Sequence, residues 1–369
     1  MSARLRSLVR PLTPLYRLAL SLRERRLESG REPVRRLQFP VISIGNLSTG
    51  GAGKTPLTIA LAQALTARGL AVDVLSRGYG RRSTVPARVN PDGSPDDYGD
   101  EPLLIARAAN VPVYVAPQRY DAGLLAESQL APSQPTELPL TSFVSGHDFS
   151  RAEESTKEKP GFSPCPLQLH LLDDGFQHRQ LHRDVDLLLL SECDLHDRLL
   201  PAGNLREPLE SLQRASALLI AENDYATANY VNQILPIDRN SEQPRWIGPI
   251  WRIHRRMQVP PNLAGNPVLA FCGIARPEQF FTGLSEAGLT LAARAAFRDH
   301  HRYTARDLQT LAAKARAAGA AILLTTEKDA VRLAHLEQPL PILAVPLRAE
   351  IEDTPAVLDW LLNRLDQTR

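Results

Sequence analysis

The sequence predicts an α/β protein: a mostly parallel sheet of the P-loop NTPase kind with helices on both faces, plus a second, smaller α/β domain. Apolar strands alternate with helical patterns along the chain, as in sheets linked by crossover helices. Many of these strands are too apolar for a sheet with one face in water. An apolar run at 40–44 leads into a glycine-rich loop and then into an Ala/Leu-rich helix at 57–68. At 369 residues the chain is long enough for two domains with proper cores.

The remaining elements of the first domain follow from apolar runs and helix start signals. Asp100, Glu101 and Pro102 are residues that helix N-termini favour, so a helix is expected from 100 to 109. From 131 to 166, prolines, serines and a charged run replace the apolar pattern, which predicts a flexible insertion. Strands are expected at 70–75, 111–115, 167–172, 185–190 and 217–221.

A second α/β unit is expected after an irregular stretch from about 225 to 265. That stretch contains the run 246–253, which we interpret as a connecting ribbon. The second unit has expected strands at 268–271, 320–325 and 342–345 and an expected helix at 305–318. The predicted division is a basic helical segment at 1–36, a P-loop domain at 37–245, a linker at 246–265 and a C-terminal α/β domain at 266–369.

The loop after the first strand has the residues of a nucleotide phosphate site. Glycines let backbone N–H groups turn toward phosphate oxygens, and the following helix N-terminus adds positive potential. Lys54 is suited to reach the β- and γ-phosphates, and Thr55 to ligate Mg²⁺. Serine stands at position 48, where the usual G-x-x-x-x-G-K-S/T motif has glycine, and an ordinary glycine-rich turn is the alternative. The loop residues are Ser48, Thr49, Gly50, Gly51, Ala52, Gly53, Lys54 and Thr55.

Two aspartates, Asp173 and Asp174, follow the apolar strand expected at 167–172. Open α/β sheets bind their ligands at the carboxyl ends of strands. In P-loop enzymes a strand-end aspartate holds Mg²⁺ directly or through water, opposite the loop threonine. A simple Asp-Asp-Gly turn is the alternative. With Lys54 in the same chain, the two segments predict a site for a Mg²⁺-bound nucleoside triphosphate.

Other charged residues have chemistry suited to phosphoryl transfer. Such a reaction needs a group to orient and deprotonate the attacking hydroxyl, and cations for the migrating charge. Each candidate has an equally ordinary interpretation as a helix cap, strand-end cap or exposed ion pair. The run 299–301 lacks a visible third ligand for a metal site. The candidates are Asp100, Glu101, Arg119, Arg206, Glu207, Asp299, His300, His301 and Lys328.

The N-terminal segment differs in charge from the rest of the chain. Residues 1–36 hold ten arginines and three glutamates, a net charge of +7, which leaves −5 for the remainder. The apolar stretch at 15–22 is far too short to span a bilayer, and no small-residue cleavage site follows it. Leu15, Leu18 and Leu22 share one helical face, which favours a helix lying on an anionic membrane surface. A helix packed on its own domain is the alternative; nucleic acid is disfavoured, because Tyr16 is the segment's sole ring.

The cysteines and the overall composition further restrict the class of protein. The three cysteines are scattered without metal-like spacing, which argues against a disulfide framework or structural zinc and suits a reducing cytoplasm. The 43% hydrophobic and 23% charged residues are ordinary for a soluble globular protein. No obligate protein partner is evident.

Taken together, the motifs resemble the tetraacyldisaccharide 4'-kinase family, the lipid A 4'-kinases of Gram-negative bacteria. The resemblance extends over nearly the whole chain in the family's order. The insertion at 131–166 departs from typical family length. The matching segments are 45–56, 76–80, 99–102, 173–178, 200–203 with 205–208, 299–300 and 326–329.

The resemblance implies a reaction and roles for particular residues. ATP would phosphorylate the 4'-hydroxyl of a tetraacylated glucosamine disaccharide 1-phosphate, giving lipid IVA, with Mg²⁺ as cofactor. Asp100 would be the catalytic carboxylate, paired with His300 from the second domain. The enzyme would lie peripherally on the cytoplasmic face of the inner membrane. Lys54 would stabilise the β- and γ-phosphates, Thr55, Asp173 and Asp174 would manage Mg²⁺, Arg206 and Glu207 would help organise the site, and Arg119 would contact phosphate.

Two functions of other classes remain open from the residues alone. A nucleotide-switch ATPase or GTPase has similar glycine-rich loops, although these commonly carry a lysine ahead of the paired glycines, where this chain has Ser48 and Thr49. A non-enzymatic membrane adaptor that uses ATP only to fold is the other. The carboxylates Asp100, Asp173 and Asp174 argue against the adaptor.

Overall fold

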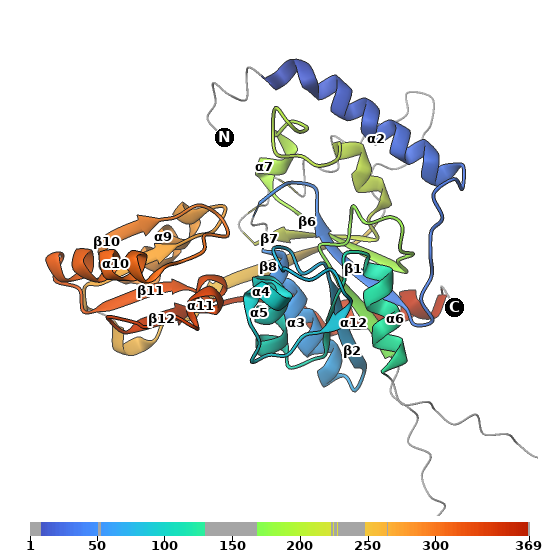
Figure 1. Ribbon diagram of the computed structural model, residues 1–369. Helices are drawn as coiled ribbons and strands as arrows, with labels where there is room; N and C mark the ends of the chain where they lie inside the picture. The colour runs from blue at the N-terminus through green and yellow to red at the C-terminus, as the bar shows by residue number, and fades with distance from the viewer. Residues whose placement is uncertain are drawn as a thin grey trace, which may run out of the picture.

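The computed structural model describes residues 9–50, 53–129, 168–222, 224, 227, 248–263 and 265–367. Two lobes are visible, each built on its own sheet, and a long N-terminal helix lies along the larger lobe (Figure 1). The expected insertion at 131–166 falls outside the described residues.

Among the described residues, the larger sheet has nine strands. The seven inner strands pair in parallel with one another, and the two outermost, β3 and β13, pair antiparallel with their neighbours. This confirms the predicted mostly parallel sheet. In spatial order the strands are β13 (Leu347–Ile351), β8 (Ile250–Met257), β7 (Ala217–Ala221), β6 (Val185–Leu190), β1 (Val41–Asn46), β5 (Gln168–Asp173), β2 (Ala71–Ser76), β4 (Val113–Val115) and β3 (Ala87–Arg88).

Helices cover both faces of this sheet, as the apolar strands predicted. Every residue of β1 and β6 is buried, because side chains that alternate along a strand meet a packed layer on either side. Leu187 and Leu189 pack with α3 (Lys54–Ala67), α5 (Asp100–Ala109) and α12 (Thr354–Gln367). Leu188 and Leu190 pack on the opposite face with α7 (Glu192–Leu195) and η2 (Leu209–Arg214). The layers are completed by α4 (Pro95–Tyr98) and α6 (Arg119–Ser128).

The N-terminal helix α2 (Thr13–Glu28), preceded by η1 (Arg10–Leu12), has one face on this lobe and one in solvent. Tyr16 and Leu20 pack against the cluster around Leu188, and Leu27 is buried. The structure shows that α2 packs on its own lobe along one face, as one alternative expected. The other face remains exposed, so a membrane-binding helix, the other alternative, is still compatible with this packing.

The smaller lobe has a four-stranded parallel sheet in the order β10–β9–β11–β12, with helices on both faces. The expected strands at 268–271, 320–325 and 342–345 and the helix at 305–318 are confirmed within a residue or two; α9 and β10 had no counterpart in the sequence prediction. The elements are η3 (Pro261–Leu263), β9 (Val268–Cys272), α9 (Pro277–Glu286), β10 (Leu291–Ala296), α10 (Ala305–Ala317), β11 (Ile322–Thr326), α11 (Glu327–Leu333) and β12 (Ile342–Val345).

The boundaries expected for the linker and the C-terminal domain differ from this arrangement. Strand β8 lies inside the stretch taken as a linker at 246–265, yet it pairs with β7 in the larger sheet. After β12 the chain returns: β13 pairs antiparallel with β8, and α12 packs on α3 beside Trp251 of β8 (Figure 1). The region 266–369 is thus not one domain. Strand β13, the last strand of this region, is half-buried at the edge of the larger sheet. Its sequence therefore lacks the continuous apolar run that identifies a central strand.

A buried charged cluster lies inside the larger lobe. His170 of β5 is fully buried, and its Nδ1 contacts Asp73 Oδ1 at 2.7 Å while its Nε2 lies 3.5 Å from Glu127 Oε1. Burial disfavours the imidazolium, but the two carboxylates outweigh it and raise the pKa of His170 to about 9. The protonated ring therefore stabilises the fold at neutral pH.

We expect the free energy of unfolding to depend on pH through this group. A raised folded-state pKa gives stability that is complete below the unfolded value near 6.5 and is lost as pH rises toward 9. Urea unfolding of the wild type should therefore lose about 2–3 kcal/mol across that interval, and His170→Gln should lose much less. Equal slopes in the two proteins would contradict the assignment; His335→Gln, in an exposed turn, is the matched control.

Candidate active site

The phosphate loop follows β1 and is attached to a second segment of the larger lobe. Thr49 N–H donates to the Asn204 carbonyl at 2.7 Å, and Ser48 forms an isolated bridge with Leu205. Gly50 and Gly53 adopt positive φ angles of 105° and 85°, a region that glycine enters without strain. Helix α3 begins at Lys54 without a side-chain cap or an acidic residue in its first turn, so its first N–H groups are available to an anion. Gly51 and Ala52 lie outside the described residues.

Serine at position 48 has a local function that glycine could not supply. Its hydroxyl is buried and accepts from Asn46 Nδ2 at 3.2 Å. Asn46 Oδ1 in turn accepts from Lys54 Nζ at 2.8 Å. The departure from the usual motif thus helps to orient the loop lysine.

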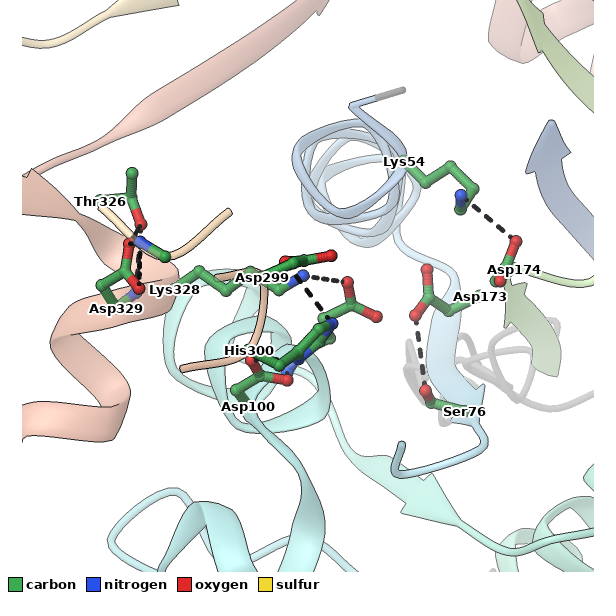
Figure 2. A network of polar contacts seen from close by, with 12 residues as sticks. Lys54, Ser76, Asp100, Asp173, Asp174, Asp299, His300, Thr326, Lys328 and Asp329 are labelled. Atoms are coloured by element: carbon green, nitrogen blue, oxygen red, sulfur yellow. Dashed lines mark hydrogen bonds and ion pairs between the residues drawn. The ribbon is translucent and has the colours of Figure 1, made fainter. Parts of the chain in front are cut away.

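The two strand-end aspartates face this loop from β5 (Figure 2). Lys54 Nζ lies 3.3 Å from Asp174 Oδ1. Asp173 is buried, and among the described residues its side-chain hydrogen bonds are two long contacts at 3.4 Å from the hydroxyls of Thr58 and Ser76. Burial, together with Glu101 and Asp174, raises the pKa of Asp173 to about 7. Lys54 and Arg119 act in the opposite direction on this pKa but do not offset the effect of burial.

Asp174 is the better-compensated aspartate. Burial would raise its pKa, but Lys54 and Arg206 together lower it. Arg206 Nη1 donates to both carboxylate oxygens, at 3.1 and 2.9 Å. The predicted grouping of Lys54, Asp174 and Arg206 is therefore present in the structure.

Thr55 and Arg119 complete the phosphate side of the site. Thr55 lies three residues before Thr58 on α3, so both side chains share the helix face toward Asp173. Arg119 is buried at the start of α6, near Asp173 and Asp174, and its Nε has no hydrogen-bond partner among the described residues. An unpaired buried N–H beside the loop fits an anionic ligand.

Glu207 lies apart from these groups. Its carboxylate pairs with Arg214 at 2.5 Å, on the side where α2 meets η2. The neighbouring Arg206 carbonyl accepts from Tyr16 of α2 at 2.8 Å. Glu207 thus supports the segment that carries Arg206 and the N-terminal helix, rather than facing Lys54 directly.

The second lobe contributes the other half of the site. Asp100, at the start of α5, is 5% exposed, and its Oδ2 lies 3.1 Å from His300 Nδ1 (Figure 2). Because a carboxylate can only accept, Nδ1 carries the proton in this contact. Burial opposes ionisation, but His300, Lys328 and Arg332 hold the pKa of Asp100 well below its usual range. The pairing that the resemblance implied between two segments 200 residues apart is present in the structure.

Two further basic residues from α11 reach the same helix start. Lys328 Nζ donates to Glu101 Oε1 at 2.6 Å, which gives the strand-end lysine a partner in the other lobe. Arg332, which the sequence analysis did not single out, donates to Asp100 from Nε at 2.8 Å. Its position one helical turn after Lys328 was the available signal. His301, by contrast, stacks on Phe297 and contacts Asp307 within the second lobe.

Comparison with known proteins identifies the family. Residues 5–366 match the family model described as tetraacyldisaccharide-1-P 4'-kinase, LpxK. The chain belongs to this family. It is 38% identical over 366 residues to the tetraacyldisaccharide 4'-kinase of Koribacter versatilis, covering 97% of this chain and 98% of that protein. It is 36% identical over 361 residues to the enzyme of that name from Geobacter sulfurreducens, covering 95% and 91%.

A solved LpxK has the same fold. The crystal structure of an "apo" form of LpxK from Aquifex aeolicus in complex with ATP superimposes with a TM-score of 0.69. The two proteins are 30% identical, and the match covers 98% of this chain and 99% of that one. The resemblance inferred from the motifs is confirmed, and the switch-NTPase and adaptor alternatives lose their support.

The residues of this LpxK family member fit a magnesium ion held jointly with phosphate. Among the described residues, no three His, Cys, Asp or Glu side chains form a cluster able to hold a metal by themselves. Mg²⁺ in nucleotide sites is commonly bound by one or two carboxylates plus phosphate oxygens. Asp173, with its raised pKa and weak hydrogen bonds, has the character of such a ligand.

Proposed function

We propose that this chain transfers the γ-phosphate of ATP to the 4'-hydroxyl of tetraacyldisaccharide 1-phosphate, which gives lipid IVA in lipid A biosynthesis. The observation that carries the proposal is the meeting of two half-sites: Lys54 and the aspartate pair on the larger lobe, and the Asp100–His300 pair between the lobes (Figure 2). Phosphoryl transfer needs these two components, a phosphate cradle and a group for the attacking hydroxyl.

The reaction assigns a task to each half-site. A bond forms between the 4'-oxygen and the γ-phosphorus while the bond from that phosphorus to the β–γ bridging oxygen breaks. Asp100 orients the hydroxyl and receives its proton, and ADP leaves. A carboxylate that is a weak base suffices, because catalysis of this step is mostly positioning and electrostatic stabilisation. His300 holds Asp100 through its Nδ1–H.

The phosphate groups are held from the larger lobe. Lys54 exchanges part of its contact with Asn46 and Asp174 for phosphate oxygens, and Arg119 supplies its Nε–H, which has no partner among the described residues. Arg206 keeps Asp174 in place. Mg²⁺, held by Thr55, Asp173 and Asp174, would neutralise charge on the transferring phosphate.

We further propose that α2 binds the cytoplasmic face of the inner membrane peripherally. Within the described residues, each helix is too short or too polar to traverse a bilayer. Four leucines of the N-terminal segment are 46–63% exposed: Leu12, Leu15, Leu18 and Leu22. The opposite face of α2 packs on the lobe near Arg206, so the bilayer and the phosphate site would be joined by one helix.

Replacing Leu15, Leu18 and Leu22 together with serine should weaken binding to vesicles that contain anionic lipid by tenfold or more. Each exposed leucine that enters the acyl boundary contributes up to about 1.5–3 kcal/mol. The arginines of the segment should make the remaining binding sensitive to salt. Vesicle sedimentation measures the effect, and Leu124→Ser, at an exposed leucine of α6, is the control. Unchanged sedimentation of the triple variant would contradict the proposed orientation.

The activity itself is tested by transfer of γ-³²P from Mg²⁺-ATP to tetraacyldisaccharide 1-phosphate in mixed micelles. A second acceptor that already carries a 4'-phosphate is the control. Label in the first lipid alone is the expected result. ATP turnover without labelled lipid would refute the proposed acceptor, and label in both lipids would refute transfer to the 4'-position.

A further inference from the structure

The Asp100 carboxylate is held from the second lobe by more than His300. Arg332 donates to Asp100 Oδ2 from Nε at 2.8 Å, and its Nη2 donates to the same oxygen. The side chains of Arg332 and Asp100 are only 7% and 5% exposed. With His300 Nδ1, three N–H groups therefore converge on one carboxylate oxygen.

Arg332 is itself fixed inside the second lobe. Its Nη1 donates to the Gly273 carbonyl at 3.0 Å and to Asp329 Oδ1 at 2.9 Å. Asp329 is fully buried and accepts from the Tyr303 hydroxyl at 3.0 Å and from Gly273 N–H at 3.1 Å. The backbone N–H of His300 donates to the same Gly273 carbonyl at 3.1 Å. Arg332 and His300 are thus positioned against Asp100 from one common carbonyl group.

The opposite carboxylate oxygen has a different environment. Asp100 Oδ1 accepts from the Glu101 N–H at 2.9 Å, the one hydrogen bond to this oxygen among the described residues. Because Oδ2 is held by two side chains, the carboxylate cannot rotate without breaking buried, charge-assisted bonds. Oδ1 is therefore the oxygen with a lone pair available to a substrate hydroxyl.

We propose that Arg332 is a positioning residue for phosphoryl transfer, which pins Oδ2 of Asp100 so that Oδ1 is directed to the acceptor hydroxyl. The proposal rests on the proposed function. Arg332 acts through Asp100, touching neither lipid nor nucleotide. Its fork of donors matters as well as its charge, since Nε and Nη2 serve Asp100 while Nη1 serves Asp329.

The alternative role for Arg332 is only to hold the two lobes together through its ion pair with Asp100. The structure offers other ion pairs across the same boundary, which makes the two roles separable. Arg302 Nη2 lies 3.4 Å from Asp96 Oδ1, with side chains 73% and 37% exposed. Arg302→Gln removes an interlobe cation with the same chemical change as Arg332→Gln, and it is therefore the matched control.

The experiment measures kcat and KM for lipid phosphorylation at neutral pH in the wild type, Arg332→Gln, Arg332→Lys and Arg302→Gln. In Arg332→Gln we expect kcat to fall about 10- to 100-fold, with KM for ATP within about threefold. Arg332→Lys, which retains the charge without the fork, should still lose about tenfold in kcat.

Each result bears on the proposal. Wild-type kcat in Arg332→Gln, or the same fall in kcat in Arg302→Gln, would overturn it. Should Arg332→Gln fail to fold, Arg332→Lys decides, and wild-type kcat in that variant would overturn the positioning role. If the wild type labels no lipid, the proposed function fails and the role of Arg332 fails with it, whereas a labelled lipid with an insensitive Arg332 refutes the positioning role alone.

Discussion

Replacing Lys54 with alanine is expected to reduce lipid phosphorylation about 10²- to 10³-fold, the scale for loss of one preorganised charge at a reacting group. The amine has no substitute at its position. It is 13% exposed, is oriented by Asn46, and lies between the loop and Asp174. Its removal also leaves Asp174 with Arg206 as its remaining close cation among the described residues.

The label-transfer assay measures this effect, with Lys314→Ala as the control. Lys314 lies on α10 in the second lobe, where its Nζ donates to the exposed Arg294 carbonyl. The two variants remove the same side chain from the same protein. A Lys54→Ala enzyme with more than about a tenth of wild-type kcat would refute the assignment of this lysine to the transferring phosphate.

Replacing Asp100 with asparagine should lower kcat about 10²-fold or more, because the acceptor hydroxyl loses its carboxylate. ATP binding should persist, since the phosphate loop is built from other elements. Stability should also fall by about 3–5 kcal/mol, because the buried Arg332 cation would lose its charged partner. Kinetics must therefore be measured well below the melting temperature, with ATP affinity as the test of folding.

Asp96→Asn supplies the control for this variant. Asp96 pairs with Arg82 at 2.5 Å on the exposed surface of the same lobe, so the substitution removes a carboxylate without touching the site. We expect near-normal kcat and stability in that protein. Normal turnover in Asp100→Asn would remove Asp100 from the mechanism and leave His300 as the residue to examine.

The sequence predicted those features that depend on neighbouring residues. Strand β1, the glycine loop and helix α3 follow one another within about 30 residues, and each carries its own local signal. Helix α5 matches its predicted bounds because its start is marked by Asp100 and Pro102. The contact between Asp100 and His300 could not be derived in this way, and it was inferred from family resemblance alone.

The missed features depend on distant parts of the chain. No sequence motif marks Arg332, and its role is apparent only from its contact with Asp100, 232 residues away along the chain. Asn46 follows the strand predicted at 40–44, in the segment predicted as a loop, and was not among the candidate residues, although its amide orients Lys54. Four of the eight residues of strand β8 are basic. This composition is typical of a surface segment, so the sequence did not indicate a strand of the larger sheet. Pairing to β7 and β13 outweighs that local composition.

The way the chain leaves and re-enters the larger sheet makes the second lobe a nested insertion. Both of its connections pass through one antiparallel ribbon, β8 leading out and β13 leading back. Where the lobe begins, the Gln258 N–H donates to the Pro346 carbonyl at 2.8 Å, so entry and exit points are adjacent in space. A lobe attached by two neighbouring strands can rock about that ribbon but cannot swivel freely. Residues 259–345 could accordingly be excised as one piece and the gap closed by a short turn, whereas truncation from the C-terminus would strip an edge strand from the nucleotide-binding lobe.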